Sequence, residues 1–161
     1  MIRKIITWYS RLLRWLLALA VGVLIFPVSL QIFSRYTELI PSYIWTEELS
    51  RFLFIWMVML GAMIGVREGS HFEVDVWPEL APRPAALLRI VSNLFVLLFA
   101  LVFVGWGIEF VRFGWNQHSE LAELPMPFIF LAWPVAGATW VLFLGESFVQ
   151  NFRILAGKTA A

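Results

Sequence analysis

The stretch Trp45–Asp75, WTEELSRFLFIWMVMLGAMIGVREGSHFEVD, decides the fold. It opens with two adjacent acids and an arginine, Glu47, Glu48 and Arg51, and is then apolar from 52 to 66 before it ends in a charged loop. An apolar run of this length between charged ends predicts a helix that crosses a membrane. Charges at the end of such a helix are costly unless they are paired. These residues are therefore the first candidates for a function.

The composition places most of the chain in lipid. Of its 161 residues, 61% are hydrophobic and only 14% are charged, whereas average soluble domains are about 45–50% apolar and about 25% charged. The net charge of +1 excludes the strong positive field of a nucleic-acid-binding protein. The absence of cysteine excludes disulfides and thiolate metal sites.

Four apolar segments are long enough to cross a bilayer, which takes roughly 20 residues in a helix. The sequence thus predicts an all-α integral membrane protein with four transmembrane helices, formed as a single domain over residues 1–161. The predicted crossings are 15–33, 45–66, 90–111 and 128–149.

The N-terminal residues 1–14 are basic and aromatic, and two interpretations stay open for them. They can form a short amphipathic helix that lies at the lipid headgroups, or a frayed basic tail. The tripeptide 18–20, Ala-Leu-Ala, resembles a signal-peptidase site, but the apolar run continues to Phe33. Because the apolar region of a signal peptide is only about 7–15 residues long, we expect a retained first helix.

The basic residues predict the orientation. With the N-terminus in the cytoplasm, nine of the twelve Lys and Arg residues fall on the cytoplasmic side. Cytoplasmic loops are enriched in these residues, so both termini are predicted to be cytoplasmic and the Glu47–Arg51 end to face outward. The nine are Arg3, Lys4, Arg11, Arg14, Arg67, Arg83, Arg89, Arg153 and Lys158, and the other three are Arg35, Arg51 and Arg112.

The charged residues at the start of the second crossing have the spacing of a local ion pair. Arg51 follows Glu47 by four residues and Glu48 by three, and both spacings bring side chains to one helix face. Three interpretations remain: a self-neutralised pair at the helix start, an interaction site for another subunit, or a ligand for a proton or sodium ion.

Small residues recur four apart in two of the crossings. Gly61 and Gly65 do so in the second, and Ala132 and Ala136 in the fourth. Such pairs let another helix approach closely, which favours association where lipid provides no hydrophobic drive. They indicate either packing inside the chain or an interface with a partner.

No pattern of catalysis or cofactor binding is present, so we expect no enzyme activity, no cofactor and no metal. A buried b-type haem needs two histidines on facing helices, but His71 and His118 fall in loops on opposite sides of the membrane. No crossing carries an acid at its centre, and Glu146 lies near the cytoplasmic end of the fourth.

Taken together, these motifs are similar to those of a known family. The chain resembles the small membrane subunit of TRAP transporters, the DctQ-type family, over nearly all of its length. The features that carry the resemblance are W-x-E-E-x-x-R at Trp45, Glu47, Glu48 and Arg51, the glycines Gly61 and Gly65, and the G-x-H-x-x-V-D pattern that includes His71 and Asp75.

The resemblance implies a tripartite, sodium-coupled importer in a bacterial or archaeal inner membrane. The expected partners are a large multi-spanning subunit that moves as an elevator, a periplasmic solute-binding protein, and the bilayer. The small subunit would pack against the static domain of the large one as a scaffold and help to dock the receptor. The solute is not encoded in this chain.

Two alternative functions remain from the residues alone. A small self-sufficient exporter that works as a homodimer also has four short helices, and here only Glu146 could serve as its membrane acid. The second alternative is a membrane anchor of a redox complex.

Overall fold

The computed structural model describes residues 2–37, 45–69, 82–120 and 122–156. In this part of the chain, four helical segments are long and apolar enough to cross a membrane, which confirms the predicted all-α fold of a multi-pass membrane protein. The short α4 leads directly into α5, so the two together form the fourth crossing. The elements are α1 (Ile2–Thr37), α2 (Trp45–Glu68), α3 (Pro82–Phe113), α4 (Pro127–Phe130) and α5 (Ala132–Leu155).

The first helix is longer than the predicted 15–33 crossing. It forms one continuous rod from Ile2, rather than a separate amphipathic helix or a frayed tail before the crossing. No glycine or proline occurs before Gly22 to interrupt it, and Pro27 lies inside the helix with its ring fully buried. Its 36 residues span roughly 54 Å at 1.5 Å per residue, well beyond a hydrocarbon layer of about 30 Å.

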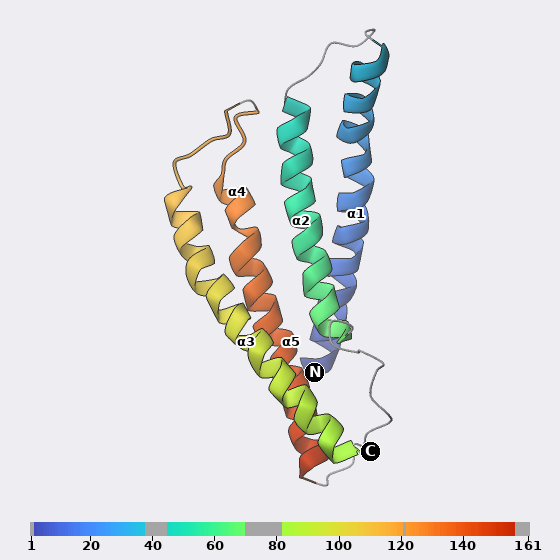
Figure 1. Ribbon diagram of the computed structural model, residues 1–161, viewed down its shortest axis with the longest axis vertical. Coiled ribbons are helices and arrows are strands. Elements are labelled where there is room, and N and C mark those ends of the chain that lie inside the picture. Colours follow the sequence, from blue (N-terminus) through green and yellow to red (C-terminus); the bar gives the residue numbers. More distant parts are fainter. Residues whose placement is uncertain (1, 38–44, 70–81, 121, 157–161) are drawn as a thin grey trace.

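The four long helices form an open row. α1 packs on α2, α2 on α5, and α5 on α3. Figure 1 shows them side by side in one layer, with α1 and α3 at the two edges. The N-terminal end of α1 and the C-terminal end of α5 lie at the same end of the row (Figure 1). The placement of that end in the cytoplasm stays a prediction.

The contact between α2 and α5 joins the two halves of the row. Met63 of α2 is fully buried there, and the indole N–H of Trp140 donates to the carbonyl oxygen of Ala62 at 3.2 Å. Nearer the other end of α2, the indole N–H of Trp56 donates to the carbonyl oxygen of Phe128 at 2.9 Å. Lipid provides no hydrophobic drive for helix association, so such packing and hydrogen bonds hold the helices together.

The pair α3–α5 depends on close backbone approach. A Cβ atom at Gly137 would lie 2.7 Å from the carbonyl oxygen of Ala100, and one at Gly107 would lie 2.7 Å from the ring of Pro134. Both members of the predicted small-residue pair in this crossing, Ala132 and Ala136, are fully buried. That pair therefore packs inside the chain.

The two helix pairs are displaced along their length. Arg67, at the end of α2, lies over the ring of Phe143 at 5.3 Å from its centroid. From this contact α5 continues to Leu155, roughly 18 Å further at 1.5 Å per residue. The pair α3–α5 thus extends beyond α1–α2 at the end where α2 finishes (Figure 1).

We expect Gly137→Ala to lower the stability of the chain. The added methyl group would press against the backbone of α3, and overpacking of this kind costs about 1–3 kcal/mol. Thermal unfolding in detergent, followed by tryptophan fluorescence, measures the effect. Gly145→Ala is the matched control, because a methyl group there meets nothing within 4 Å on the same helix. Equal stability of the two variants would contradict the close approach.

Candidate functional site

One face of α2 is open along its length. Glu47, Arg51, Phe54, Val58 and Gly61 lie on it at helical spacing, on the side opposite to the buried residues of the helix. Phe54 and Val58 are 53% and 47% exposed. This face of α2 therefore carries Glu47 and Arg51 together with Gly61 of the glycine motif, all of which the sequence singled out.

The glycine motif belongs to this open face. A Cβ atom at Gly61 would meet nothing within 4 Å, so no described residue packs closely on this glycine. Gly65 follows one turn later on the same face. The interpretation of the motif as an interface with a partner stays a prediction.

The two acids of the first turn point in different directions. Glu47 is exposed on the open face, whereas Glu48 is half-buried on the side of the loop between α3 and α4. The carboxylate of Glu48 accepts a hydrogen bond from the backbone N–H of Ala122 at 2.7 Å. Hydrogen bonds of this charged type are short and strong, so Glu48 fixes that loop against α2.

The loop itself is ordered as a short hairpin, which we define as residues 114–120 and 122–126. His118 and Pro125 pair as an antiparallel bridge, and the backbone N–H of Ser119 donates to the carbonyl oxygen of Leu124 at 2.9 Å. Glu123 has a φ of 52°, the left-handed conformation that tight turns use. The sequence predicted only a polar connection here, because no alternating pattern marks these residues as paired.

Arg51 does not form the predicted pair. Its side chain is exposed on the open face, and among the described residues it has no ion pair with Glu47 or Glu48. Helix spacing permits such a pair, but Glu48 is turned toward the hairpin instead. A cation thus lies without an acidic partner in the described chain, close to the end of a membrane helix.

The other end of α2 is tied to α1. Glu68 pairs with Arg14 at 3.2 Å, and the guanidinium of Arg67 donates to the carbonyl oxygen of Ile6 at 3.0 Å. Cations near the C-terminal end of a helix are also favoured by its dipole. These contacts fix the two helices in register and satisfy the charges at this end.

Of the remaining predicted positions, His71 and Asp75 lie outside the described residues. His118 is exposed in the hairpin. The described residues contain no group of three or more His, Cys, Asp or Glu side chains that could hold a metal ion. Glu146 is half-buried near the end of α5 and accepts a hydrogen bond from Gln150 at 3.5 Å.

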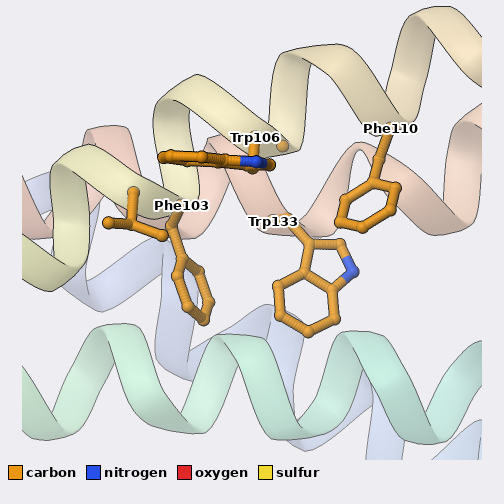
Figure 2. Close-up of a pocket in the computed structure, with 6 residues that line it drawn as sticks. Phe103, Trp106, Phe110 and Trp133 are labelled. Atoms are coloured by element: carbon orange, nitrogen blue, oxygen red, sulfur yellow. The ribbon is translucent and has the colours of Figure 1, made fainter.

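An apolar groove of about 370 Å³ lies on the other half of the row. Figure 2 shows Phe103, Trp106 and Phe110 from α3 around it, together with Trp133. Solute sites combine apolar walls with a few polar groups that fix the ligand. This groove has no carboxylate, amine or hydroxyl group in its lining, so it suits apolar contacts rather than an ionic solute.

Comparison with known families decides what kind of protein carries these surfaces. Residues 24–154 match the model of the DctQ component of tripartite ATP-independent periplasmic (TRAP) transporters. The chain belongs to this family. It is a small membrane subunit of a TRAP transporter, as the resemblance implied.

Individual DctQ relatives show how the match is distributed. A putative TRAP transporter small permease protein of Haemophilus influenzae is 33% identical over 94 residues, 57% of this chain and 58% of the relative. A second one from the same organism is 23% identical over 96% of this chain and 94% of the relative. The sialic acid TRAP transporter permease protein SiaT of Haemophilus influenzae is 30% identical over 76% of this chain, but only 20% of its own length is matched.

We expect Glu48→Ala to loosen the hairpin of this DctQ subunit. The variant leaves the N–H of Ala122 without its charged acceptor, and loss of a partner by such a group costs about 1–3 kcal/mol. Hydrogen exchange at the Ala122 amide should therefore accelerate by about 5- to 150-fold. Glu47→Ala is the matched control, since Glu47 is exposed on the open face. Equal exchange in both variants would contradict the contact.

Proposed function

We propose that this chain is the scaffold subunit of a sodium-coupled TRAP importer in a bacterial or archaeal inner membrane. In this role it packs against the static domain of a large multi-spanning subunit, which carries the solute and moves as an elevator. The chain itself transports no solute and catalyses no reaction. Its outer end helps to dock a periplasmic solute-binding protein.

The observation that carries the proposal is the open face of α2. Its glycine Gly61 leaves room for another helix to approach, and Arg51 brings a cation with no ion pair in the described chain. Charges near the membrane are costly unless they are paired. A large membrane subunit that supplies a helix over Gly61 and an acid near Arg51 would satisfy both.

The open row supports a scaffold rather than a passage. Each of the two central helices contacts neighbours on both sides, and the edge helices α1 and α3 do not close on each other to form a bundle. A single layer of helices encloses no central path for a solute. It presents broad apolar sides on which a second membrane protein can rest.

The SiaT and DctMQ relatives also support a membrane partner. The matched region is 20% of the SiaT permease protein and 22% of an isethionate TRAP transporter permease protein, DctMQ, from Oleidesulfovibrio alaskensis. In these relatives a segment similar to this chain is part of a much longer polypeptide. A covalent link of this kind is consistent with a permanent partner for the separate subunit.

The hairpin and the first turn of α2 support a docking role at the outer end. Glu47, Glu120 and Glu123 are exposed there, and the Glu48 contact holds the hairpin in place. An ordered surface with exposed acids suits a soluble partner with a basic surface, because complementary charge steers protein encounters.

We expect Gly61→Leu to disrupt assembly without harm to the isolated chain. The leucine would occupy the space that a partner helix needs, and should reduce co-purification with the large subunit by about tenfold or more. The large subunit from the neighbouring reading frame is co-expressed, and detergent size exclusion measures the complex. Gly22→Leu on α1 is the matched control, because that glycine is also open within 4 Å.

Two results would overturn the proposal. One is equal co-purification of both glycine variants and the wild type. The other is that the large subunit and the receptor, without this chain, take up solute with sodium at the same rate as the complete transporter. Solute flux by the chain alone in proteoliposomes would favour the small exporter instead.

Arg51→Ala separates stability from assembly. In the isolated chain the free energy of unfolding should change by under about 1 kcal/mol, because exposed charges contribute little. In the complex, loss of the cation leaves an acid of the partner unpaired and should weaken assembly. Thermal unfolding of the chain and size exclusion of the complex measure the two effects, and an unaffected complex would contradict a charged contact at Arg51.

A further inference from the structure

The start of α1 carries a face of alternating cations and tryptophans. Lys4, Trp8, Arg11 and Trp15 follow one another at intervals of four, three and four residues, which places them on one side of the helix. All four are exposed, with Trp8 at 65% and Trp15 at 72%. We call these four residues the basic–aromatic stripe.

The stripe points away from the rest of the chain. The buried residues of this part of α1, Ile6 and Leu13, lie on the opposite side of the helix. α1 is also an edge helix that packs chiefly on α2. No described part of the chain covers the stripe.

The two cations of the stripe are uncompensated. The nearby Arg14 pairs with Glu68, and Arg67 donates to α1, whereas Lys4 and Arg11 have no ion pair or hydrogen bond with another described residue. No acid occurs anywhere in α1. The face therefore has a net positive charge that no described residue of the chain balances.

The side chains of the stripe are of the kinds that favour the depth of lipid headgroups. The Arg14–Glu68 ion pair marks a polar boundary next to it, and tryptophan is enriched at membrane interfaces. Further along, the same face is apolar and exposed at Leu19 and Phe26, with open space over Gly22. A polar, basic surface that suits lipid headgroups is thus followed, on the same helix face, by an apolar surface that suits acyl chains.

We propose that the basic–aromatic stripe is a binding site for an anionic phospholipid. Lys4 and Arg11 attract the phosphate and the second negative group of the lipid, because basic residues beside a membrane helix select anionic headgroups. The indole N–H groups of Trp8 and Trp15 can donate to lipid oxygens, and the acyl chains lie along the apolar face beyond. The site is separate from the α2 face and does not rest on the proposed function.

Brominated lipids test this site. The full chain is reconstituted in phosphatidylcholine vesicles that contain a minor fraction of dibrominated phosphatidylglycerol or dibrominated phosphatidylcholine. Quenching of tryptophan fluorescence is compared between the wild type and Trp8→Phe/Trp15→Phe, so that the difference reports on the stripe. We expect the anionic lipid to quench these two tryptophans several-fold more strongly, and the preference to fall at high salt.

Lys4→Gln/Arg11→Gln should reduce the preference for the anionic lipid by on the order of tenfold. The reason is that the double variant removes two cations, and each Lys or Arg near an anionic membrane surface contributes about 1 kcal/mol of attraction. Arg35→Gln, at the far end of the same helix, is the matched control and should retain it. Inorganic phosphate at equal ionic strength should not compete. Equal quenching by both lipids in the wild type, retention of the preference in the double variant, or equal loss in Arg35→Gln would overturn the proposal. Loss of quenching by both lipids in the complex with the large subunit would also overturn it, because a protein would then cover the stripe.

Discussion

The whole row depends on the contact between α2 and α5. α3 packs on α5, whereas α1 packs chiefly on α2 and also reaches α5, where the hydroxyl groups of Tyr9 and Thr139 share a hydrogen bond at 2.8 Å. The contact of α2 with α5 consists of the buried Met63 and the Trp140–Ala62 hydrogen bond, and the hydrogen bond from Trp56 to Phe128 extends it to α4. In lipid, burial of an apolar side chain between helices stabilises their association only slightly, because lipid is also apolar. The indole N–H groups that donate to backbone carbonyls therefore add stability and also fix how the helices are oriented.

The position of α2 in the row explains why its motif residues face one way. Its flanks are used by α1 and α5, and the face between them is left for Glu47, Arg51 and Gly61. The edge helix α1 is different, because its exposed side combines cations with tryptophan. The exposed face of α2 thus combines glycine with two charged residues, and the exposed face of α1 combines cations with tryptophan.

The sequence predicted the number and type of the crossings because long apolar runs leave few alternatives in a bilayer. It did not predict the order of the helices in space, since apolar side chains such as Phe54 look the same whether they face lipid or protein. The start of α1 at Ile2 was missed because basic residues were taken as a sign of a separate segment. At the candidate site, the spacing of Glu48 and Arg51 was correctly read as helical, but the Glu48–Ala122 contact connects residues far apart in the chain and leaves no local pattern.

The displacement between the two helix pairs has a consequence for the bilayer. If the helices stood upright, the roughly 18 Å by which α5 continues past the end of α2 would exceed half of a hydrocarbon layer of about 30 Å, so α2 and α5 could not end at the same depth. A lean of the row within its own plane brings both pairs to the same depth, and it also shortens the vertical reach of the long α1 and α3. A subunit of this shape would cross the bilayer as a slanted wall, and the slope of that wall would follow from the register between Arg67 and Phe143.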